Sequence, residues 1–227
     1  MYGVVVPTYN EADNIKVLIK EIRERVKDVV IIVVDDNSGD NTAEIAKQMG
    51  AVVFVRTNER GLGSALRFGL KKAVEMGLSH IATMDADLSH DPSFLPLMFN
   101  ASLNADLVIG SRYIQGGKIE NWPLKRKIIS KGANLITRIL LRSPVQDNTS
   151  GYRVYSAKAV EVVSSCQNAG GYEFQICAIY KVLRNNLRIV EVPIVFRDRE
   201  KGNSKLDNGK MLRWLSYVMK LSLGLTS

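Results

Sequence analysis

Histidine and cysteine are scarce in this chain, which has two of each among 227 residues. Cys166 and Cys177 are too few for a disulfide framework or a zinc site, so we expect buried thiols in a reducing compartment. His80 and His90 are equally poor candidates for metal ligands. Any metal site would therefore be built from hard oxygen ligands.

Long apolar runs are also missing. No stretch of about 20 uncharged apolar residues occurs, so no segment is expected to span a bilayer. The first apolar run, Val4–Val6, ends at Pro7 and is too short for a secretory signal. The chain is nevertheless 46% apolar, with a net charge of +8 and a pI near 9.5. This composition predicts one large globular domain with an anionic partner, such as a phosphate, a nucleic acid or a lipid surface.

A complete dinucleotide-binding fingerprint is missing as well. Gly61-Leu62-Gly63 follows the predicted strand 52–55 and opens a predicted helix, but the third glycine is absent. The first strand-to-helix turn, where such a fold holds its pyrophosphate, has no glycine and carries Glu11. A nicotinamide or flavin cofactor is therefore disfavoured. We interpret the two glycines as a sharp turn that aims backbone N–H groups at a nucleotide.

Strands and helices alternate along the first half of the chain. Apolar and β-branched runs predict strands at 3–6, 29–34, 52–55, 81–83 and 106–111, and helical spacing predicts helices at 12–26 and 43–49. This order is typical of an α/β domain with a mostly parallel, doubly wound sheet. Amphipathic surface helices are predicted at 124–141 and 211–227, and a proline-interrupted edge strand at 189–196.

Acidic side chains stand at the ends of three predicted strands. Glu11 follows the first strand, Asp36 the second, and Asp85 and Asp87 follow strand 81–83. Two carboxylates so close are costly unless a cation lies between them, and the carboxyl ends of parallel strands are where α/β sheets bind ligands. Oxygen ligands suit Mg²⁺ or Mn²⁺, which usually also hold substrate phosphates. The pattern predicts a metal-diphosphate site, while helix capping is the alternative explanation for a single aspartate.

Cations dominate residues 118–142, with seven lysines and arginines against one acid, Glu120. This bias, with Trp122 before helix 124–141, fits a helix lying on an anionic membrane, although a solvated surface helix is the commoner case. The polar loop 146–153 is predicted to form a second wall of the site. Segment 197–205 is interpreted either as a solvated loop or as a lid that closes on phosphates.

Several short motifs together resemble a known family. They are Pro-Thr-Tyr-Asn-Glu at 7–11, Val-Asp-Asp-Asn-Ser at 34–38, Asp-Ala-Asp-Leu-Ser-His at 85–90, Gly-Ser-Arg-Tyr at 110–113, Thr-Ser-Gly-Tyr-Arg at 149–153, Gly-Tyr-Glu-Phe-Gln at 171–175 and Ser-Lys-Leu at 204–206. The combination is similar to family 2 inverting glycosyltransferases of GT-A fold. Glu-Asn-Trp-Pro at 120–123 makes it most similar to the dolichol-phosphate mannose synthases.

The resemblance implies one glycosyltransferase domain that transfers mannose from GDP-mannose to dolichyl (polyprenyl) phosphate with inversion and with Mg²⁺ or Mn²⁺. Residues 1–115 would be the nucleotide- and metal-binding half, 116–210 the acceptor side with the basic helix and the lid, and 211–227 a C-terminal amphipathic helix. A polyprenyl-phosphate glucosyltransferase or a polysaccharide transferase is the alternative within the family. A basic nucleic-acid-binding module is the alternative outside it, but such a module does not need acids at three strand ends.

The resemblance also implies roles for single residues. The residues expected to hold guanosine are Pro7, Tyr9, Glu11, Val34 and Asp36, and those expected to hold ribose, metal and diphosphate are Asp85, Ala86, Asp87 and Ser89. The metal ligands would be Asp87 and Ser89, although many relatives have Gln in place of Ser89. The expected catalytic residues are Asp87, Arg112, Arg126, Arg199 and Lys205, whose cations would handle the phosphates of donor and acceptor.

A phosphate acceptor arrives already ionised, so no catalytic base is expected. Asp91 and Asp147 are expected to be exposed carboxylates that tolerate neutralisation. The lipid acceptor predicts a peripheral protein on the cytoplasmic side of a membrane, with a small membrane-anchoring subunit as an optional partner.

Overall fold

The computed structural model describes residues 1–198 and 208–226. Its strands are β1 (Tyr2–Thr8), β2 (Val30–Asp35), β3 (Val52–Val55), β4 (His80–Thr83), β5 (Leu107–Ser111), β6 (Lys118–Glu120), β7 (Arg153–Ser156), β8 (Ile189–Pro193) and β9 (Val195–Arg197). Its helices are α1 (Ala12–Arg25), α2 (Thr42–Gln48), α3 (Leu62–Glu75), α4 (Leu95–Ser102), α5 (Leu124–Leu141), α6 (Ala157–Val163), α7 (Glu173–Arg184) and α8 (Asn208–Ser222), with a short 3₁₀ helix at Pro92–Phe94.

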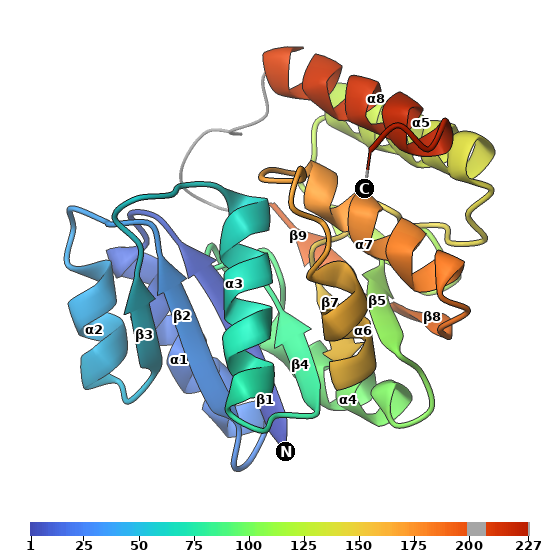
Figure 1. The fold of residues 1–227 in the computed structure, drawn as a ribbon. Helices are drawn as coiled ribbons and strands as arrows, with labels where there is room; N and C mark the ends of the chain where they lie inside the picture. The colour runs from blue at the N-terminus through green and yellow to red at the C-terminus, as the bar shows by residue number, and fades with distance from the viewer. Residues whose placement is uncertain (199–207, 227) are drawn as a thin grey trace.

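Within these residues the main sheet has seven strands in the order β3-β2-β1-β4-β7-β5-β8, and β6 pairs with β9 in a second sheet (Figure 1). Every pairing in the main sheet is parallel except those of β7 with β4 and β5. The mostly parallel α/β sheet is therefore confirmed, and β8 lies at its edge as predicted. The predicted strand 189–196 is not one strand, however, because it divides into β8 and β9 in different sheets. The antiparallel strand β7 was not predicted, because its four residues form no long apolar run.

The two faces of the sheet bury alternate side chains of the same strands. Val5 and Ile32 pack in the core layer that contains residues of α3, α6 and α7. Val4 and Ile31 pack on the opposite face with residues of α1 and α4. A strand buried on both faces needs apolar residues at consecutive positions, which explains the continuous run at 29–34. The doubly wound architecture is thus confirmed, with helices covering both faces (Figure 1).

The two predicted amphipathic helices lie side by side, outside the α7 layer (Figure 1). Helix α5 has the predicted bounds, and α8 begins slightly earlier and ends earlier than predicted. Val218 and Leu221 of α8 are fully buried in the core layer of α7. No helix in the described part of the chain combines the length and the apolar character needed to cross a membrane.

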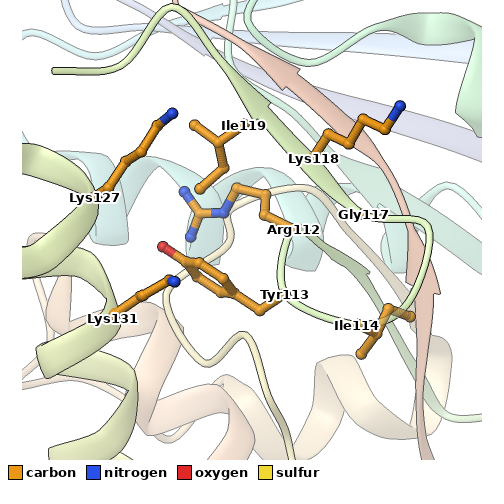
Figure 2. A pocket seen from close by; sticks show the side chains of 8 residues that line it. All are labelled: Arg112, Tyr113, Ile114, Gly117, Lys118, Ile119, Lys127 and Lys131. Atoms are coloured by element: carbon orange, nitrogen blue, oxygen red, sulfur yellow. The ribbon is translucent and has the colours of Figure 1, made fainter. Parts of the chain in front are cut away.

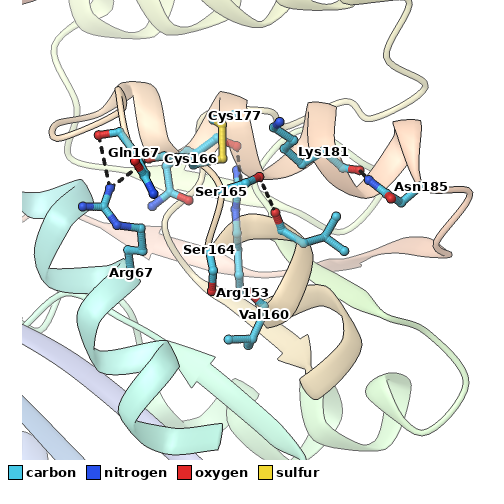
Figure 3. The surroundings of a disulfide bond; sticks show 12 residues. Arg67, Arg153, Val160, Ser164, Ser165, Cys166, Gln167, Cys177, Lys181 and Asn185 are labelled. Atoms are coloured by element: carbon cyan, nitrogen blue, oxygen red, sulfur yellow. Dashed lines mark hydrogen bonds between the residues drawn. A yellow bond between two sulfur atoms is a disulfide. The ribbon is translucent and has the colours of Figure 1, made fainter. Parts of the chain in front are cut away.

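Cys166 and Cys177 form a disulfide, so the expectation of two buried thiols is wrong (Figure 3). Both residues are fully buried, and their Cα atoms are 6.0 Å apart. A cysteine count does not reveal which cysteines meet in space. Here Cys166 follows α6 and Cys177 lies in α7, and these two helices contact each other.

The loop closed by this disulfide packs against the start of α3. Arg67 of α3 donates from Nη1 to the carbonyl of Cys166 at 2.9 Å (Figure 3). Gly63 donates from its backbone N–H to the carbonyl of Gly170 at 2.9 Å. A Cβ on Gly63 would lie 2.2 Å from the carbonyl oxygen of Ala169, so only glycine permits this approach. The predicted Gly61-Leu62-Gly63 turn is therefore a site of close backbone packing.

Reducing the disulfide should lower the free energy of unfolding by about 3 kcal/mol, because the bridge restrains the unfolded chain. Urea unfolding followed by circular dichroism, with and without a phosphine reductant, measures the difference. The doubly substituted variant Cys166→Ser, Cys177→Ser is the control, since its stability should not respond to the reductant. Two reactive thiols in the denatured wild-type protein without reductant would contradict the bond.

Candidate functional site

The carboxyl ends of β1, β2 and β4 meet at one edge of the sheet, because these strands are parallel neighbours. Glu11 lies at the N-cap of α1 after β1, and its backbone N–H donates to Thr42 Oγ1 at 2.9 Å. Asp36 follows β2, while Asp85 and Asp87 follow β4. The structure therefore brings the predicted acids to a common edge.

The two consecutive acids at the end of β2 are both engaged with this chain's own groups. Asp35 is buried and accepts hydrogen bonds from Thr8 Oγ1 at 2.7 Å and Ser38 Oγ at 2.6 Å. Asp36 is buried and accepts from Arg56 Nε at 2.9 Å and from the Gly61 N–H at 2.8 Å. Asp36 thus anchors the segment between β3 and α3.

Arg56 was not singled out from the sequence. It directly follows β3, so its place at a strand end was the one signal that could have indicated a partner for Asp36.

Val34 is fully buried, so any contact with a ligand would have to come through its main chain. Tyr9 is 41% exposed, and the Arg60 guanidinium carbon lies 5.0 Å from the centroid of its ring. The surface of the site beside β1 therefore presents the aromatic ring of Tyr9 and the cation of Arg60.

The turn after β4 is held from within by its own residues. Ser89 donates to Asp87 Oδ1 from Oγ at 2.6 Å and from its N–H at 3.2 Å. The Asp85 N–H donates to His90 Nδ1 at 3.0 Å. Burial lowers the pKa of His90 despite the opposing charges of Asp85 and Asp87, which keeps Nδ1 available as an acceptor. Ser89 and His90 are buried, whereas the Asp85 side chain is 41% exposed.

The donor set of this turn suits a cation that arrives with a phosphate ligand. In residues 1–198 and 208–226, no three acidic, histidine or cysteine side chains converge to hold a metal by themselves. Asp87 Oδ1 and Ser89 Oγ nevertheless place two hard oxygens 2.6 Å apart. Mg²⁺ usually binds through one or two carboxylates plus waters and substrate phosphates rather than in an all-protein cage. The residues therefore fit a cation shared with a diphosphate.

Arg112 and Asp147 form a buried ion pair on the other side of the site. Arg112 Nε and Nη2 lie 2.7 Å from the two carboxylate oxygens of Asp147, and Nη2 also donates to Thr149 Oγ1 at 2.8 Å. Burial is the largest single influence and would raise the pKa of Asp147, but the Arg112 charge and the hydrogen bonds from Arg112 and Thr149 together outweigh it, so the pKa is lowered. Asp147 is fully buried, so its predicted exposure is wrong. The sequence does not reveal a partner 35 residues away.

A basic pocket of about 310 Å³ opens beside Arg112 (Figure 2). Lys127 and Lys131 extend into it from α5, and Lys118 lies on the opposite side (Figure 2). The other lining residues are Tyr113, Ile114, Gly117 and Ile119. None of the lining residues is acidic. Sequence reasoning missed Lys127 and Lys131 as site residues, although their spacing of four on one helix was a usable signal.

Arg126 and the pocket residue Arg112 both lie against the ring of Trp122, so Arg126 is close to this pocket. Its guanidinium carbon is 4.1 Å from the centroid of the Trp122 ring, and that of Arg112 is 5.3 Å from the same ring. Arg126 Nη1 also pairs with Asp198 at 2.8 Å. The predicted phosphate-binding residues Arg199 and Lys205 lie outside the described residues.

The polar loop 146–153 joins the two sides of the site. Asp147 holds Arg112, and a Cβ on Gly151 would lie 3.8 Å from Asp85 Oδ1 and 3.7 Å from His90 Cε1. Arg153, which is fully buried, donates to the carbonyls of Ser150, Asn148 and Gln175. These bonds tie the loop to α7 and place it between the acidic edge and the basic pocket.

Comparison with known proteins places this architecture in a family. The profile of glycosyl transferase family 2 matches residues 3–164. The chain belongs to that family. Polyprenol monophosphomannose synthase of Mycolicibacterium smegmatis is 38% identical over 216 residues, which cover 92% of this chain and 82% of the relative. Undecaprenyl-phosphate mannosyltransferase of Micrococcus luteus is 40% identical over 211 residues, which cover 90% of this chain and 87% of the relative.

Solved structures confirm the GT-A fold of this family 2 glycosyltransferase. Glucosyl-3-phosphoglycerate synthase from Mycobacterium tuberculosis, in complex with Mn²⁺, UDP-glucose and phosphoglyceric acid, superposes with a TM-score of 0.75 at 24% identity. The likeness covers 100% of this chain and 81% of the synthase. At this identity the comparison establishes the fold alone.

Neutralising Asp147 in this family 2 glycosyltransferase should strongly destabilise it. Asp147→Asn should lower the free energy of unfolding by about 3–5 kcal/mol, because it leaves the buried Arg112 cation without its partner. Asp91→Asn is the matched control, since the Asp91 side chain is 34% exposed. Urea unfolding at pH 7 measures the free energy of unfolding of both variants. An Asp147→Asn protein as stable as Asp91→Asn would contradict the role of the pair.

The Arg112–Asp147 pair also predicts how the stability of the protein changes with pH. Folding lowers the pKa of Asp147. Its contribution to the free energy of unfolding should therefore be complete above its unfolded-state pKa of about 3.9 and lost as the pH falls toward its folded-state pKa. Wild-type stability should therefore drop more between pH 5 and pH 3 than that of Asp147→Asn.

Proposed function

We propose that this protein transfers mannose from GDP-mannose to polyprenyl (dolichyl) phosphate with inversion at the sugar. The observation that carries the proposal is the basic pocket of Arg112, Lys118, Lys127 and Lys131, which has no acidic lining residue and lies beside exposed apolar residues of α5. A phosphate attached to a long apolar chain matches both features. The two relatives named for polyprenyl-linked mannose transfer support the same sugar and acceptor.

The donor would bind at the acidic edge of the sheet. Guanosine would lie near Pro7, Tyr9, Glu11, Val34 and Asp36, where the exposed Tyr9 ring offers a stacking surface for the base. Ribose and diphosphate would lie over Asp85, Ala86 and Asp87. When bound, Mg²⁺ or Mn²⁺ held by Asp87 and Ser89 would neutralise the departing diphosphate. The glucosyl-3-phosphoglycerate synthase crystallised with Mn²⁺ and a nucleotide sugar supports such a cation.

The acceptor phosphate would bind at the basic pocket. Its second pKa is near 6, so it arrives as an anionic nucleophile and needs no base. Lys127 and Lys131 would hold it, with Arg112 kept in orientation by Asp147 and Arg126 by Trp122 and Asp198. Asp147 itself is a poor proton acceptor, because Arg112 engages both of its oxygens and lowers its pKa. Arg199 and Lys205 complete the proposed set of phosphate-binding cations.

Radiolabelled GDP-mannose, incubated with Mn²⁺ and vesicles that contain polyprenyl phosphate, should yield labelled lipid. GDP-glucose and UDP-glucose should yield far less. The double variant Lys127→Ala, Lys131→Ala should lose turnover by about a hundredfold, a size typical of losing groups that stabilise charge. Lys125→Ala is the matched control, because Lys125 is an exposed residue of α5 outside the pocket. Preferred transfer of glucose, or equal activity of the double variant and the control, would contradict the proposal.

We further propose that the protein binds peripherally to the cytoplasmic side of a membrane, with a small anchoring subunit as an optional partner. On α5, Leu124, Ile128 and Ile139 are 73%, 62% and 67% exposed. The neighbouring α8 carries Leu212, which is 70% exposed, and Leu223 follows it at 69%. Exposed apolar residues on a helix that also carries lysines are typical of interfacial binding to anionic lipid.

Replacing Ile128 and Ile139 by Glu should weaken binding to anionic liposomes by about a hundredfold or more, because each isoleucine buried in lipid contributes about 2 kcal/mol. Liposome flotation measures the bound fraction. The matched control is Leu97→Glu, Leu103→Glu, which changes two residues of similar character, 46% and 58% exposed, at α4. Wild-type protein that fails to float with liposomes containing polyprenyl phosphate would rule out this attachment.

A further inference from the structure

His90 closes the turn that carries Asp85 and Asp87. It is 2% exposed, and its Nδ1 accepts the Asp85 N–H at 3.0 Å. The ring stacks on Tyr152, with centroids 5.0 Å apart, and meets Phe196 edge-on at 5.4 Å. Packing therefore fixes the ring on two sides, while its hydrogen bond fixes the main chain of the turn.

Strand β9 supports the same turn from outside. His90 and Phe196 form an antiparallel bridge, and the Arg197 N–H donates to the Ser89 carbonyl at 3.3 Å. Leu88, which directly follows Asp87, has a φ of 62°, a left-handed conformation that is unfavourable for leucine. A turn with such a residue does not hold its shape by local preference, so it depends on these tertiary contacts.

We propose that His90 is a positioning residue for nucleotide-sugar transfer. Its imidazole fixes the main chain at Asp85 and thereby holds Asp85 and Asp87 in the arrangement that binds a nucleoside diphosphate with its divalent cation. This inference rests on the proposed function for the identity of the donor. His90 acts through Asp85 and not through contact with the donor, in the way that outer residues orient metal ligands in other proteins.

A purely structural role for a buried histidine is the competing explanation, and the chain contains its own control. His80 stands at the other end of β4, with Nδ1 3.0 Å from Ser102 Oγ and its ring 5.9 Å from that of Tyr2. Both histidines thus combine a hydrogen bond at Nδ1 with an aromatic neighbour. Only His90 lies next to the acids.

The test compares the wild-type protein with its variants. Isothermal titration calorimetry measures how tightly each of them binds GDP, and separately UDP, in the presence of Mn²⁺. His90→Phe keeps an aromatic ring but loses the acceptor, and should weaken binding by about tenfold or more. His90→Asn places an amide oxygen where Nδ1 stood, and should bind close to wild type. His80→Phe should leave binding unchanged. Thermal unfolding checks that each variant folds.

His90→Gln covers the case in which His90→Phe does not fold. Its amide lies one methylene further out, so it should bind weakly where His90→Asn binds well. Wild-type binding by His90→Phe, or equal losses in the asparagine and glutamine variants, would overturn the role of His90. Wild-type protein that binds nucleotide with Mn²⁺ but transfers no mannose would overturn the proposed function alone. Wild-type protein that binds neither nucleotide would overturn both.

Discussion

Carboxylates gathered at the edge of a parallel sheet must each be stabilised, and this constraint organises the site. Asp35 is satisfied by Thr8 and Ser38, and Asp36 by Arg56 and the Gly61 N–H. Across the site, Asp147 is satisfied by Arg112. These internal partners turn most of the acids into structural anchors. The Asp85 side chain is instead 41% exposed, and the Asp85–Asp87 turn is the part of the edge suited to a cation brought by a substrate.

The cations follow a complementary arrangement. Arg56 is buried and paired with Asp36, whereas Lys127 and Lys131 line a pocket without acidic lining residues, which they share with the Asp147-bound Arg112. A transferase that joins two phosphorylated substrates has to hold two anions near each other, and separate cationic environments reduce their repulsion. Loop 146–153 couples the two environments, since Asp147 holds Arg112 and Gly151 lies against Asp85 and His90. The exposed apolar residues of α5 stand next to the acceptor side, where a lipid chain would leave the protein.

Local sequence patterns predicted the parts of the structure that depend on neighbours in the chain. Continuous apolar runs located β1, β2 and β4, helical spacing gave the bounds of α5, and Asp85-x-Asp87 at a strand end located the turn. Contacts between distant segments were not predictable from one sequence. The Cys166–Cys177 bond, the Arg112–Asp147 pair and the packing of His90 between Tyr152 and Phe196 each require the folded topology. Lys127 and Lys131 were visible as charges, but their pocket exists only because β5, β6 and α5 meet.

The central claim is that donor diphosphate and acceptor phosphate bind side by side, one at the acidic edge and the other at the basic pocket. Phosphorus NMR of a short-chain polyprenyl phosphate tests it directly, because bound Mn²⁺ broadens the signals of nearby nuclei. We expect the acceptor signal to broaden when protein, GDP and Mn²⁺ are all present, and to remain sharp with Mg²⁺ in place of Mn²⁺. An acceptor that binds the protein but shows no Mn²⁺-dependent broadening would contradict this account.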